Sequence, residues 1–281
     1  MRHVLLVFIM FLMSNMLLAH EIKITDLYNR EVLIPEKVER VLALGAGSLR
    51  LLVYAGAQEL IVGRELFEEK IDKSLRPYTY NLPDNYNKLP IVSAGGPEVM
   101  PDVEAIKDVK PDLIFVSALK EDQVEKLSWL TGIPIIGLTY GDIGHTDLEK
   151  IKESIRLIGY ATHTQKRTQF LLNKMAMLRK DIFERSYKQE RRSVFMAAIS
   201  YRGERQFAST ERAHPSCNML NIHNIADDIN IEINKPTHTI LSMAYIINKQ
   251  PDYIFYDITG VDELTKNYNN LFSVLYKVEA V

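Results

Sequence analysis

Several side chains that bind anions or stack on aromatic rings follow the short apolar runs of this sequence. In open α/β sheets, ligands bind at the loops that follow the carboxyl ends of strands. The residues selected on this basis are Ser48, Arg64, Ser117, Tyr140, Tyr201, Arg205, Gln206 and His214. A guanidinium group pairs well with anionic oxygens, and a tyrosine can stack on a ligand ring. These residue types predict a binding site for an anionic ligand.

Two kinds of reactive site find little support. A bare zinc or manganese site needs several ligands in a cluster, whereas the histidines are scattered, so we expect no bound metal and no cofactor. Gly45 and Gly47 follow an apolar run, and Glu65 comes about twenty residues later, which imitates a dinucleotide fingerprint. The third glycine position of that fingerprint holds Arg50. An NAD-dependent enzyme that uses this turn is the alternative from another class, and no Ser-His-Asp pattern is visible.

Composition narrows the class of protein. The chain has 281 residues, 47% hydrophobic and 25% charged, with a formal net charge of −2. These values are ordinary for a globular protein of one or two domains, and no basic stripe indicates nucleic-acid binding. Cys217 is the only cysteine, so no intrachain disulfide can form.

The first nineteen residues read as a signal peptide. Arg2 and His3 precede the apolar run 4–13, and Ala19 ends a second apolar stretch. This segment is short for a membrane span and has the order of a secretory leader. We therefore expect an exported protein that begins near His20, in the periplasm or another extracytoplasmic space. An uncleaved anchor is the alternative, because Leu17 is larger than the residue preferred at that position of a cleavage site. No cysteine stands directly after the leader, so we do not expect a lipoprotein.

One segment occurs in two diverged copies. The first, Asp102–Phe115, reads DVEAIKDVKPDLIF, and the second, Ile240–Phe255, reads ILSMAYIINKQPDYIF. Each predicts a helix, a Pro-Asp turn and a buried strand, because proline ends the helix and an apolar run follows. A unit that recurs once, half a chain apart, indicates two similar α/β lobes and not a solenoid.

The elements outside the two copies complete the expected organisation. We expect a signal peptide at 1–19, an N-terminal α/β lobe at 20–145, a helical linker at 146–189 and a C-terminal α/β lobe at 190–281. The fold class is two Rossmann-like lobes joined by one long helix, with a ligand cleft between them. Other strands are expected at 40–44, 60–63, 89–92, 134–138 and 194–200, a linker helix that ends at Gly159, and a bridging helix at 162–187 with one apolar face.

The order of these segments resembles the substrate-binding proteins of ABC importers for iron–siderophore complexes, haem and cobalamin. The opening DLYNREVLIPEKVERVLAL carries the similarity in Asp26, Arg30, Pro35 and Arg40, and the stretches LLVYAGAQELIVGRE, VEAIKDVKPDLIFVS, YRGERQFASTE and PDYIF follow. The resemblance covers about residues 22–280. It implies a helix-linked, two-lobed protein that performs no chemistry, binds a ferric chelate, haem, a corrinoid or an oxyanion, and delivers it to a membrane permease.

The resemblance also implies partners and two departures. A glutamate on each lobe of such proteins docks onto the permease, and Glu104 matches the N-terminal one, whereas Ala244 stands at the second position. The family normally continues beyond the point that matches the end of this chain, so we expect an incomplete C-terminal lobe. We expect a monomer that binds a small-molecule metal complex and permease subunits. A non-transport sensor or degenerate paralogue is a further alternative.

Overall fold

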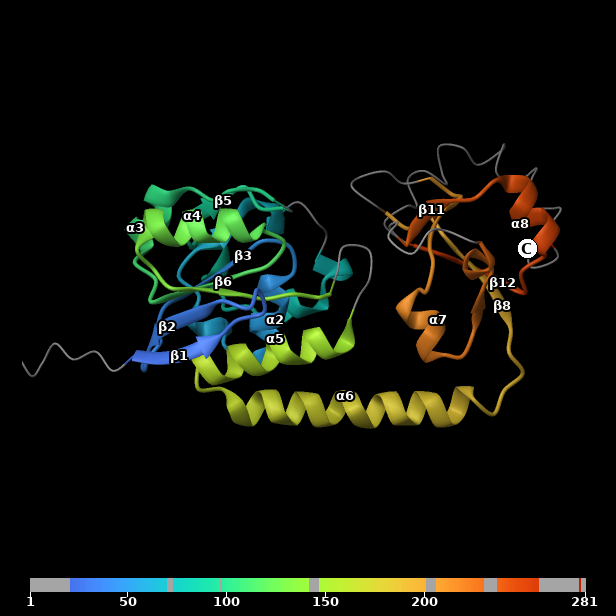
Figure 1. Cartoon of the computed structure of the whole chain (residues 1–281), viewed down its shortest axis with the longest axis horizontal. Helices are drawn as coiled ribbons and strands as arrows, with labels where there is room; N and C mark the ends of the chain where they lie inside the picture. Colours follow the sequence, from blue (N-terminus) through green and yellow to red (C-terminus); the bar gives the residue numbers. More distant parts are fainter. Residues whose placement is uncertain are drawn as a thin grey trace, which may run out of the picture. The chain divides into compact units, whose positions relative to one another are not determined.

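The computed structural model describes residues 21–69, 73–96, 98–141, 147–200, 206–229, 237–257 and 278. The chain divides into two compact units (Figure 1). Unit 1 contains the chain up to Tyr140 together with Leu148–Leu172, and unit 2 contains Gly141–Asp147 and the chain from Asn173 onward. The predicted leader, residues 1–19, and His20 lie outside the described residues.

Unit 1 alternates strands with helices. Its strands are β1 (Glu21–Thr25), β2 (Glu31–Pro35), β3 (Val41–Leu44), β4 (Arg64–Glu65), β5 (Ile91–Ser93), β6 (Leu113–Val116) and β7 (Ile135–Gly137). Its α-helices are α2 (Ser48–Ala55), α3 (Val103–Val109), α4 (Glu121–Thr131), α5 (Leu148–Ala161) and the start of α6 (Gln165–Ser186). Short 3-10 turns η1 (Gln58–Leu60), η2 (Leu66–Glu69), η3 (Lys73–Leu75), η4 (Pro77–Asn81) and η5 (Tyr86–Lys88) fill the connection from α2 to β5.

The central strands of unit 1 are parallel. β3 pairs with β6, and β6 pairs with β7. β4 pairs with β5, and a parallel bridge from Val41 to Ile61 brings this pair beside β3. The strand expected at 60–63 was therefore misplaced, since only Ile61 bridges there and β4 begins at Arg64. β4 and β5 lie on one side of β3, and β6 and β7 lie on the other side. The strand order therefore reverses between β3 and β6.

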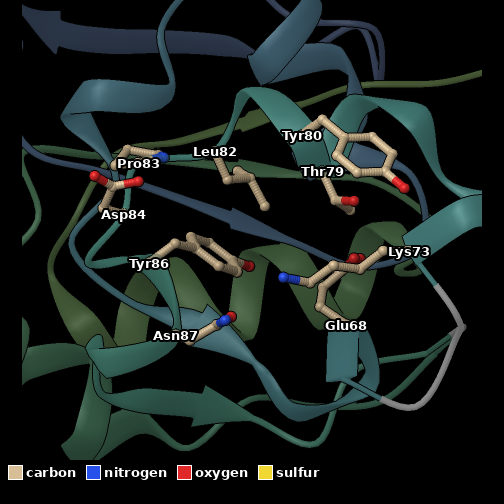
Figure 2. A pocket seen from close by; sticks show the side chains of 9 residues that line it. All are labelled: Glu68, Lys73, Thr79, Tyr80, Leu82, Pro83, Asp84, Tyr86 and Asn87. Carbon is tan, nitrogen blue, oxygen red and sulfur yellow. The ribbon is translucent and has the colours of Figure 1, made fainter.

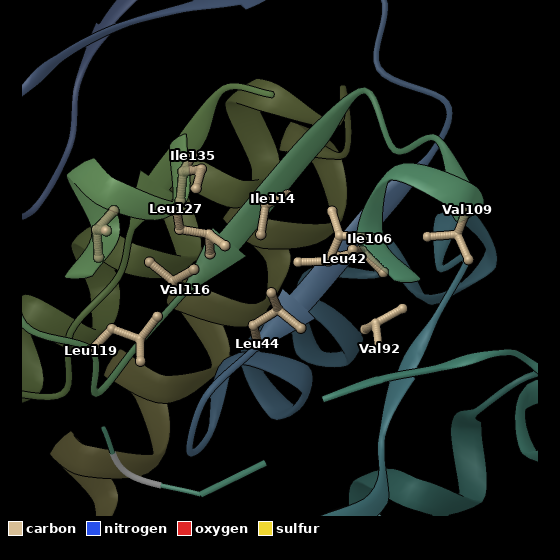
Figure 3. Packing of buried hydrophobic residues seen from close by; sticks show 11 residues of the cluster. Leu42, Leu44, Val92, Ile106, Val109, Ile114, Val116, Leu119, Leu127 and Ile135 are labelled. Atoms are coloured by element: carbon tan, nitrogen blue, oxygen red, sulfur yellow. The ribbon is translucent and has the colours of Figure 1, made fainter. Parts of the chain in front are cut away.

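A buried apolar core forms under one face of this sheet. Helices α3 and α4 lie on that face, and α2 and α5 lie on the other (Figure 1). The core cluster consists of Leu42, Leu44, Val92, Ile106, Val109, Ile114, Val116, Leu119, Val124, Leu127 and Ile135 (Figure 3). Every residue of β3 and β6 is buried, as expected for strands that helices cover on both faces.

The Asp26–Arg30 pattern near the start of the chain has a structural role. The buried Asp26 carboxylate accepts hydrogen bonds from the backbone N–H groups of Tyr28, Arg30 and Gly137, at 2.9, 3.0 and 2.9 Å. The Arg30 guanidinium pairs with the same carboxylate at 2.5 Å. This carboxylate therefore fastens the β1–β2 hairpin to the end of β7.

Helix α5 continues past the glycine that we expected to end it. Gly159 lies inside the helix, where an added Cβ would sit 2.5 Å from the Thr168 hydroxyl of α6. The glycine thus permits close packing of two helices, which its sequence context does not reveal. α5 packs on α2 within unit 1, whereas α6 passes from unit 1 into unit 2. The bridging helix is confirmed. Of the apolar face predicted for it, Leu171, Met175 and Ile182 are half-buried, whereas Phe170 and Leu178 are exposed.

Unit 2 contains a second parallel sheet. Its strands are β8 (Ser193–Ala197), β9 (Ser209–Glu211), β10 (His223–Asn224), β11 (His238–Ile240) and β12 (Tyr253–Tyr256), and its helices are α7 (Pro215–Met219), η6 (Ile225–Asp228) and α8 (Met243–Lys249). The sheet has the order β10-β8-β12, and β9 pairs antiparallel with β11. The core cluster comprises Phe195, Ala197, Phe207, Ile225, Ala226, Leu241 and Ile246.

The two sequence copies fold alike, in separate sheets. α3 leads to β6 in unit 1, and α8 leads to β12 in unit 2. Each helix ends at a left-handed residue before its proline, Lys110 with φ 45° and Gln250 with φ 43°. The α/β fold class that the repeat predicts is confirmed.

Candidate functional site

The carboxyl ends of β3 and β6 meet where the strand order of unit 1 reverses. In parallel sheets this is the usual position of a ligand site, because the loops diverge there. The loop 45–47 follows β3 and leads into α2, while Ser117 follows β6. An added Cβ on Gly45, which has φ 81°, would lie 1.8 Å from the Ser117 carbonyl oxygen. The two loops are therefore in close contact.

The serines predicted to bind ligand hold these loops together. Ser48 and Ser117 are buried, and their hydroxyl oxygens lie 2.9 Å apart. The Ser117 hydroxyl donates to the Ala46 carbonyl at 2.7 Å, and the Ser48 hydroxyl lies 2.7 Å from the Leu44 carbonyl. The structure thus brings the two residues together, with their hydroxyl groups engaged inside the protein.

The acidic residue of the apparent dinucleotide fingerprint faces its own loop. Both carboxylate oxygens of Glu65 lie 3.1 Å from the Gly45 backbone nitrogen, which donates to them. Burial raises the pKa of Glu65, and the hydrogen bond from Gly45 opposes that shift. Glu65 therefore positions the loop after β3 and is not placed to bind a ribose.

Arg64 is bound within unit 1. Its side chain is 8% exposed. The guanidinium donates to the Leu89 carbonyl at 3.0 Å and pairs with the Glu69 carboxylate. A ligand that used Arg64 would have to compete with Glu69 for it.

Tyr140 packs over the loop after β3. Its hydroxyl donates to the Gly47 carbonyl at 2.8 Å. Gly47 has φ 90°, and an added Cβ would lie 2.6 Å from the Tyr140 ring. Burial raises the pKa of Tyr140, so the phenol stays protonated at neutral pH. Tyr140, which was predicted to bind the ligand, therefore lies at the carboxyl edge of the sheet, beside the loop 45–47 that leads into Ser48.

The structure adds Arg50, a residue that the sequence reading assigned no binding role. Its guanidinium carbon lies 5.9 Å from the centre of the Tyr78 ring and 5.5 Å from that of Tyr140. Arg50 is exposed and has no ion pair or hydrogen bond with any described residue. A cation in the first turn opposes the helix dipole, and α2 has no acidic residue there. This unfavourable position of a cation is the feature of the sequence that could have indicated a functional role for Arg50.

In unit 2 the described residues include two of the four predicted contacts. Gln206 is exposed, and His214 lies half-buried directly before α7. Burial lowers the pKa of His214, against the opposing effects of Glu211, Asp257 and Asp227. Its buried Nδ1 has no hydrogen-bond partner in the described part of the chain. Tyr201 and Arg205 lie outside the described residues.

The residue predicted to dock on a permease is accessible. Glu104 occupies the first turn of α3 with 82% of its side chain exposed, and it pairs with Lys107 at 3.2 Å. Ala244 is exposed at the corresponding position of α8. Among the described residues, no helix is long and apolar enough to cross a membrane, and no group of three potential ligands could hold a metal ion.

Comparison with solved structures gives the same fold at low sequence identity. The molybdate periplasmic binding protein MolA of Haemophilus influenzae matches with a TM-score of 0.64 at 17% identity, covering 84% of this chain and 73% of that one. The petrobactin-binding protein YclQ of Bacillus subtilis gives 0.63 at 19%, covering 84% and 77%. The periplasmic vitamin B12 binding protein BtuF of Vibrio cholerae gives 0.59 at 16%, covering 86% and 84%.

Sequence comparison identifies the family. No curated protein matches this chain in sequence. The family model described as periplasmic binding protein matches residues 41–270, which span both units. Proteins of this kind act outside the cytoplasmic membrane and bring small molecules to ABC permeases. The chain belongs to the periplasmic binding protein family.

Proposed function

We propose that this protein captures an iron–siderophore-type metal complex outside the cytoplasmic membrane and delivers it to an ABC permease. The protein is exported by its leader, is not a lipoprotein, works as a monomer and turns over no substrate. The proposal adds the cargo to the general role of the family. Similar folds serve molybdate, petrobactin and vitamin B12 in their own proteins, so the fold alone does not select among these cargoes.

Arg50 is the observation that supports an anionic cargo. Its guanidinium is open to solvent and unpaired in the described part of the chain, and it lies near the rings of Tyr78 and Tyr140. An arginine beside aromatic rings offers donors for anionic oxygens, and the rings offer stacking surfaces. A ferric chelate with catecholate or carboxylate arms presents both chemistries.

Unit 2 contributes the second half of the proposed contacts. Gln206 offers an exposed amide and His214 a half-buried imidazole ring, and Arg205 and Tyr201 are proposed to join them. In unit 1, Tyr140 takes part through its ring. Ser48, Ser117 and Arg64 support the loops, and they reach the cargo only if it displaces their present partners.

Calorimetric titration with iron(III) tris-catecholate tests the proposal. The full mature protein should bind it, and Arg50→Ala should weaken binding by about tenfold or more, because a hydrogen bond to a charged group is lost. Arg156→Ala, at an exposed arginine of α5, is the matched control and should change nothing.

Parallel titrations with molybdate, haemin and cyanocobalamin identify the cargo class. Tight binding of molybdate alone would replace the chelate by an oxyanion, which Arg50 could equally hold. Tight binding of cyanocobalamin with no effect of Arg50→Ala would overturn both the cargo and the role of Arg50.

A further inference from the structure

Unit 1 contains a pocket in the connection between β4 and β5. Its volume is about 300 Å³. The lining residues are Glu68, Lys73, Thr79, Tyr80, Leu82, Pro83, Asp84, Tyr86 and Asn87 (Figure 2). The connection starts at the carboxyl end of β4 and also supplies Tyr78 to the neighbourhood of Arg50. A pocket of this size suits a small molecule or one arm of a larger one.

Tyr86 gives the pocket a hydroxyl group that has no hydrogen-bond partner among the described residues. The residue is only 5% exposed, and its hydroxyl makes no hydrogen bond with any described residue. Figure 2 shows the hydroxyl directed into the pocket. Burial raises the pKa of Tyr86, so the phenol is a neutral donor at physiological pH. The hydroxyl is therefore free to donate a hydrogen bond to a ligand in the pocket.

Lys73 adds a cation, and the acidic residues do not neutralise it. Figure 2 shows its ammonium directed toward the middle of the pocket, and Lys73 forms no ion pair with a described residue. The Glu68 carboxylate is paired with Arg76 and accepts a hydrogen bond from the Tyr78 hydroxyl at 2.9 Å. The exposed Asp84 lies at the far side of the pocket, with its carboxylate directed away from Lys73.

Apolar groups complete the walls. The rings of Tyr80 and Tyr86, with Leu82 and Pro83, line the space beside the two donors. This combination matches a ligand with an anionic oxygen group at one end and an apolar body at the other. We propose that this pocket binds a small organic carboxylate, with the carboxylate at Lys73 and Tyr86 and the apolar body against Leu82, Pro83 and Tyr80. The carboxylate is a free acid or an arm of a larger chelate.

Fluorine NMR with three probes of the same shape tests the charge requirement on the full mature protein. 4-Fluorobenzoate should bind with saturable line broadening. Its neutral isostere 4-fluorobenzamide should bind with an affinity at least about tenfold lower, because the donors favour an anion. The cation 4-fluorobenzylammonium should not bind. Equal binding of the three probes, or no binding of 4-fluorobenzoate, would overturn the proposal.

Two variants and a matched control assign the site. Lys73→Met and Tyr86→Phe should each weaken 4-fluorobenzoate binding by about tenfold, since each removes one donor to a charged group. Tyr86→Phe retains the buried ring, and unchanged circular dichroism would show that the fold is intact. Lys88→Met removes an exposed lysine of η5 that does not line the pocket, and it should bind like the unaltered protein. Equal losses in Lys73→Met and Lys88→Met would overturn the assignment.

A competition experiment separates the two sources of the carboxylate. Release of bound 4-fluorobenzoate by a saturating ferric chelate with carboxylate arms would indicate that the pocket receives an arm of the cargo. Simultaneous binding would indicate a free acid. The pocket rests on contacts within unit 1 only, so 4-fluorobenzoate binding without chelate binding would refute the proposed cargo and leave this inference standing.

Discussion

The two sequence copies share a backbone design and differ in what covers it. In unit 1, Asp102 caps α3 by accepting from the N–H groups of Glu104 and Ala105, and in unit 2 Ser242 caps α8 by accepting from the N–H of Tyr245. A left-handed residue and a Pro-Asp pair follow each helix. Each helix–strand copy therefore depends on a residue that caps the helix, a left-handed residue that ends it, and the aspartate that follows the proline.

That aspartate joins each copy to the neighbouring strand. Asp112 accepts from the N–H groups of Glu39 and Arg40, at 2.8 and 2.9 Å, just before β3. Asp252 accepts from the N–H and hydroxyl of Ser193, at 2.6 and 2.7 Å, at the start of β8.

Burial separates the two copies. All of β6 is buried, whereas Phe255 of β12 is 46% exposed and Tyr253 is 51% exposed. The two exposed rings stack with their centres 6.2 Å apart. The comparison teaches that a few polar residues suffice to set the local backbone, while the surrounding elements set the burial of its strand.

Truncating the two equivalent phenylalanines should give the largest contrast. Phe115 is fully buried, so Phe115→Ala should destabilise unit 1 by about 3–5 kcal/mol. Phe255→Ala should cost about 1 kcal/mol, because roughly half of that ring is already in water. Hydrogen exchange of β6 at increasing urea concentration reports on unit 1, and hydrogen exchange of β12 reports on unit 2. Equal costs would show that the exposed face of β12 is covered in solution.

Removing the two caps should have smaller effects. Asp102→Ala should cost about 1–2 kcal/mol, since its carboxylate accepts from two N–H groups, and Ser242→Ala about 0.5–1 kcal/mol, since its hydroxyl accepts from one. Hydrogen exchange at the first turn of each helix measures both. Asp102→Ser keeps a capping oxygen and should remain near the unaltered protein, so a loss as large as that of Asp102→Ala would argue against capping.

The difference between Glu104 and Ala244 in docking onto a permease should have a smaller effect again. An exposed carboxylate–arginine pair contributes roughly 0–1 kcal/mol, and more where the interface excludes water. Glu104→Ala should reduce uptake in a reconstituted transport assay without altering ligand affinity, and added salt should have a similar effect. Ala244→Glu should strengthen docking. Unchanged uptake in Glu104→Ala would place the docking surface elsewhere.

The smallest effect concerns acid stability in unit 2. The backbone N–H of Ser193, its hydroxyl and Arg192 lower the pKa of Asp252. Because the pKa is lower in the folded state, ionised Asp252 stabilises the fold above the unfolded value of about 4, and this contribution disappears as the pH falls through the folded value. The hydrogen-exchange protection of β8 should decrease below about pH 4 in the unaltered protein. In Asp252→Asn this decrease should be smaller. Ser193→Ala, which keeps the N–H donor, should have an intermediate effect.

Much of the fold could be predicted because its signals are local. Pro111 and Pro251, with the apolar runs after them, mark the two helix–strand copies, and apolar residues at helical spacing indicate the long helix. The strand near Ile61 and the end of α5 could not be placed, because each depends on a distant segment. Ile61 only bridges Val41, and Gly159 accommodates Thr168.

The candidate site was less predictable than the fold. Ser48, Ser117 and Tyr140 were expected at the carboxyl edge of unit 1 and lie there, but their hydroxyl groups bind protein atoms. Which polar groups a fold uses internally depends on partners far apart in sequence, as for Arg64 and Leu89. Tyr86 could not be selected, since its lack of a partner is visible only in three dimensions.

The contact between Gly47 and Tyr140 has a consequence for mutational tolerance. Any side chain at position 47 would collide with the Tyr140 ring and would require a left-handed backbone that other residues seldom adopt. Displacing that ring would also remove one of the two rings near Arg50. In a saturation library, position 47 should therefore be intolerant in a selection for cargo capture, even where the folded protein still accumulates.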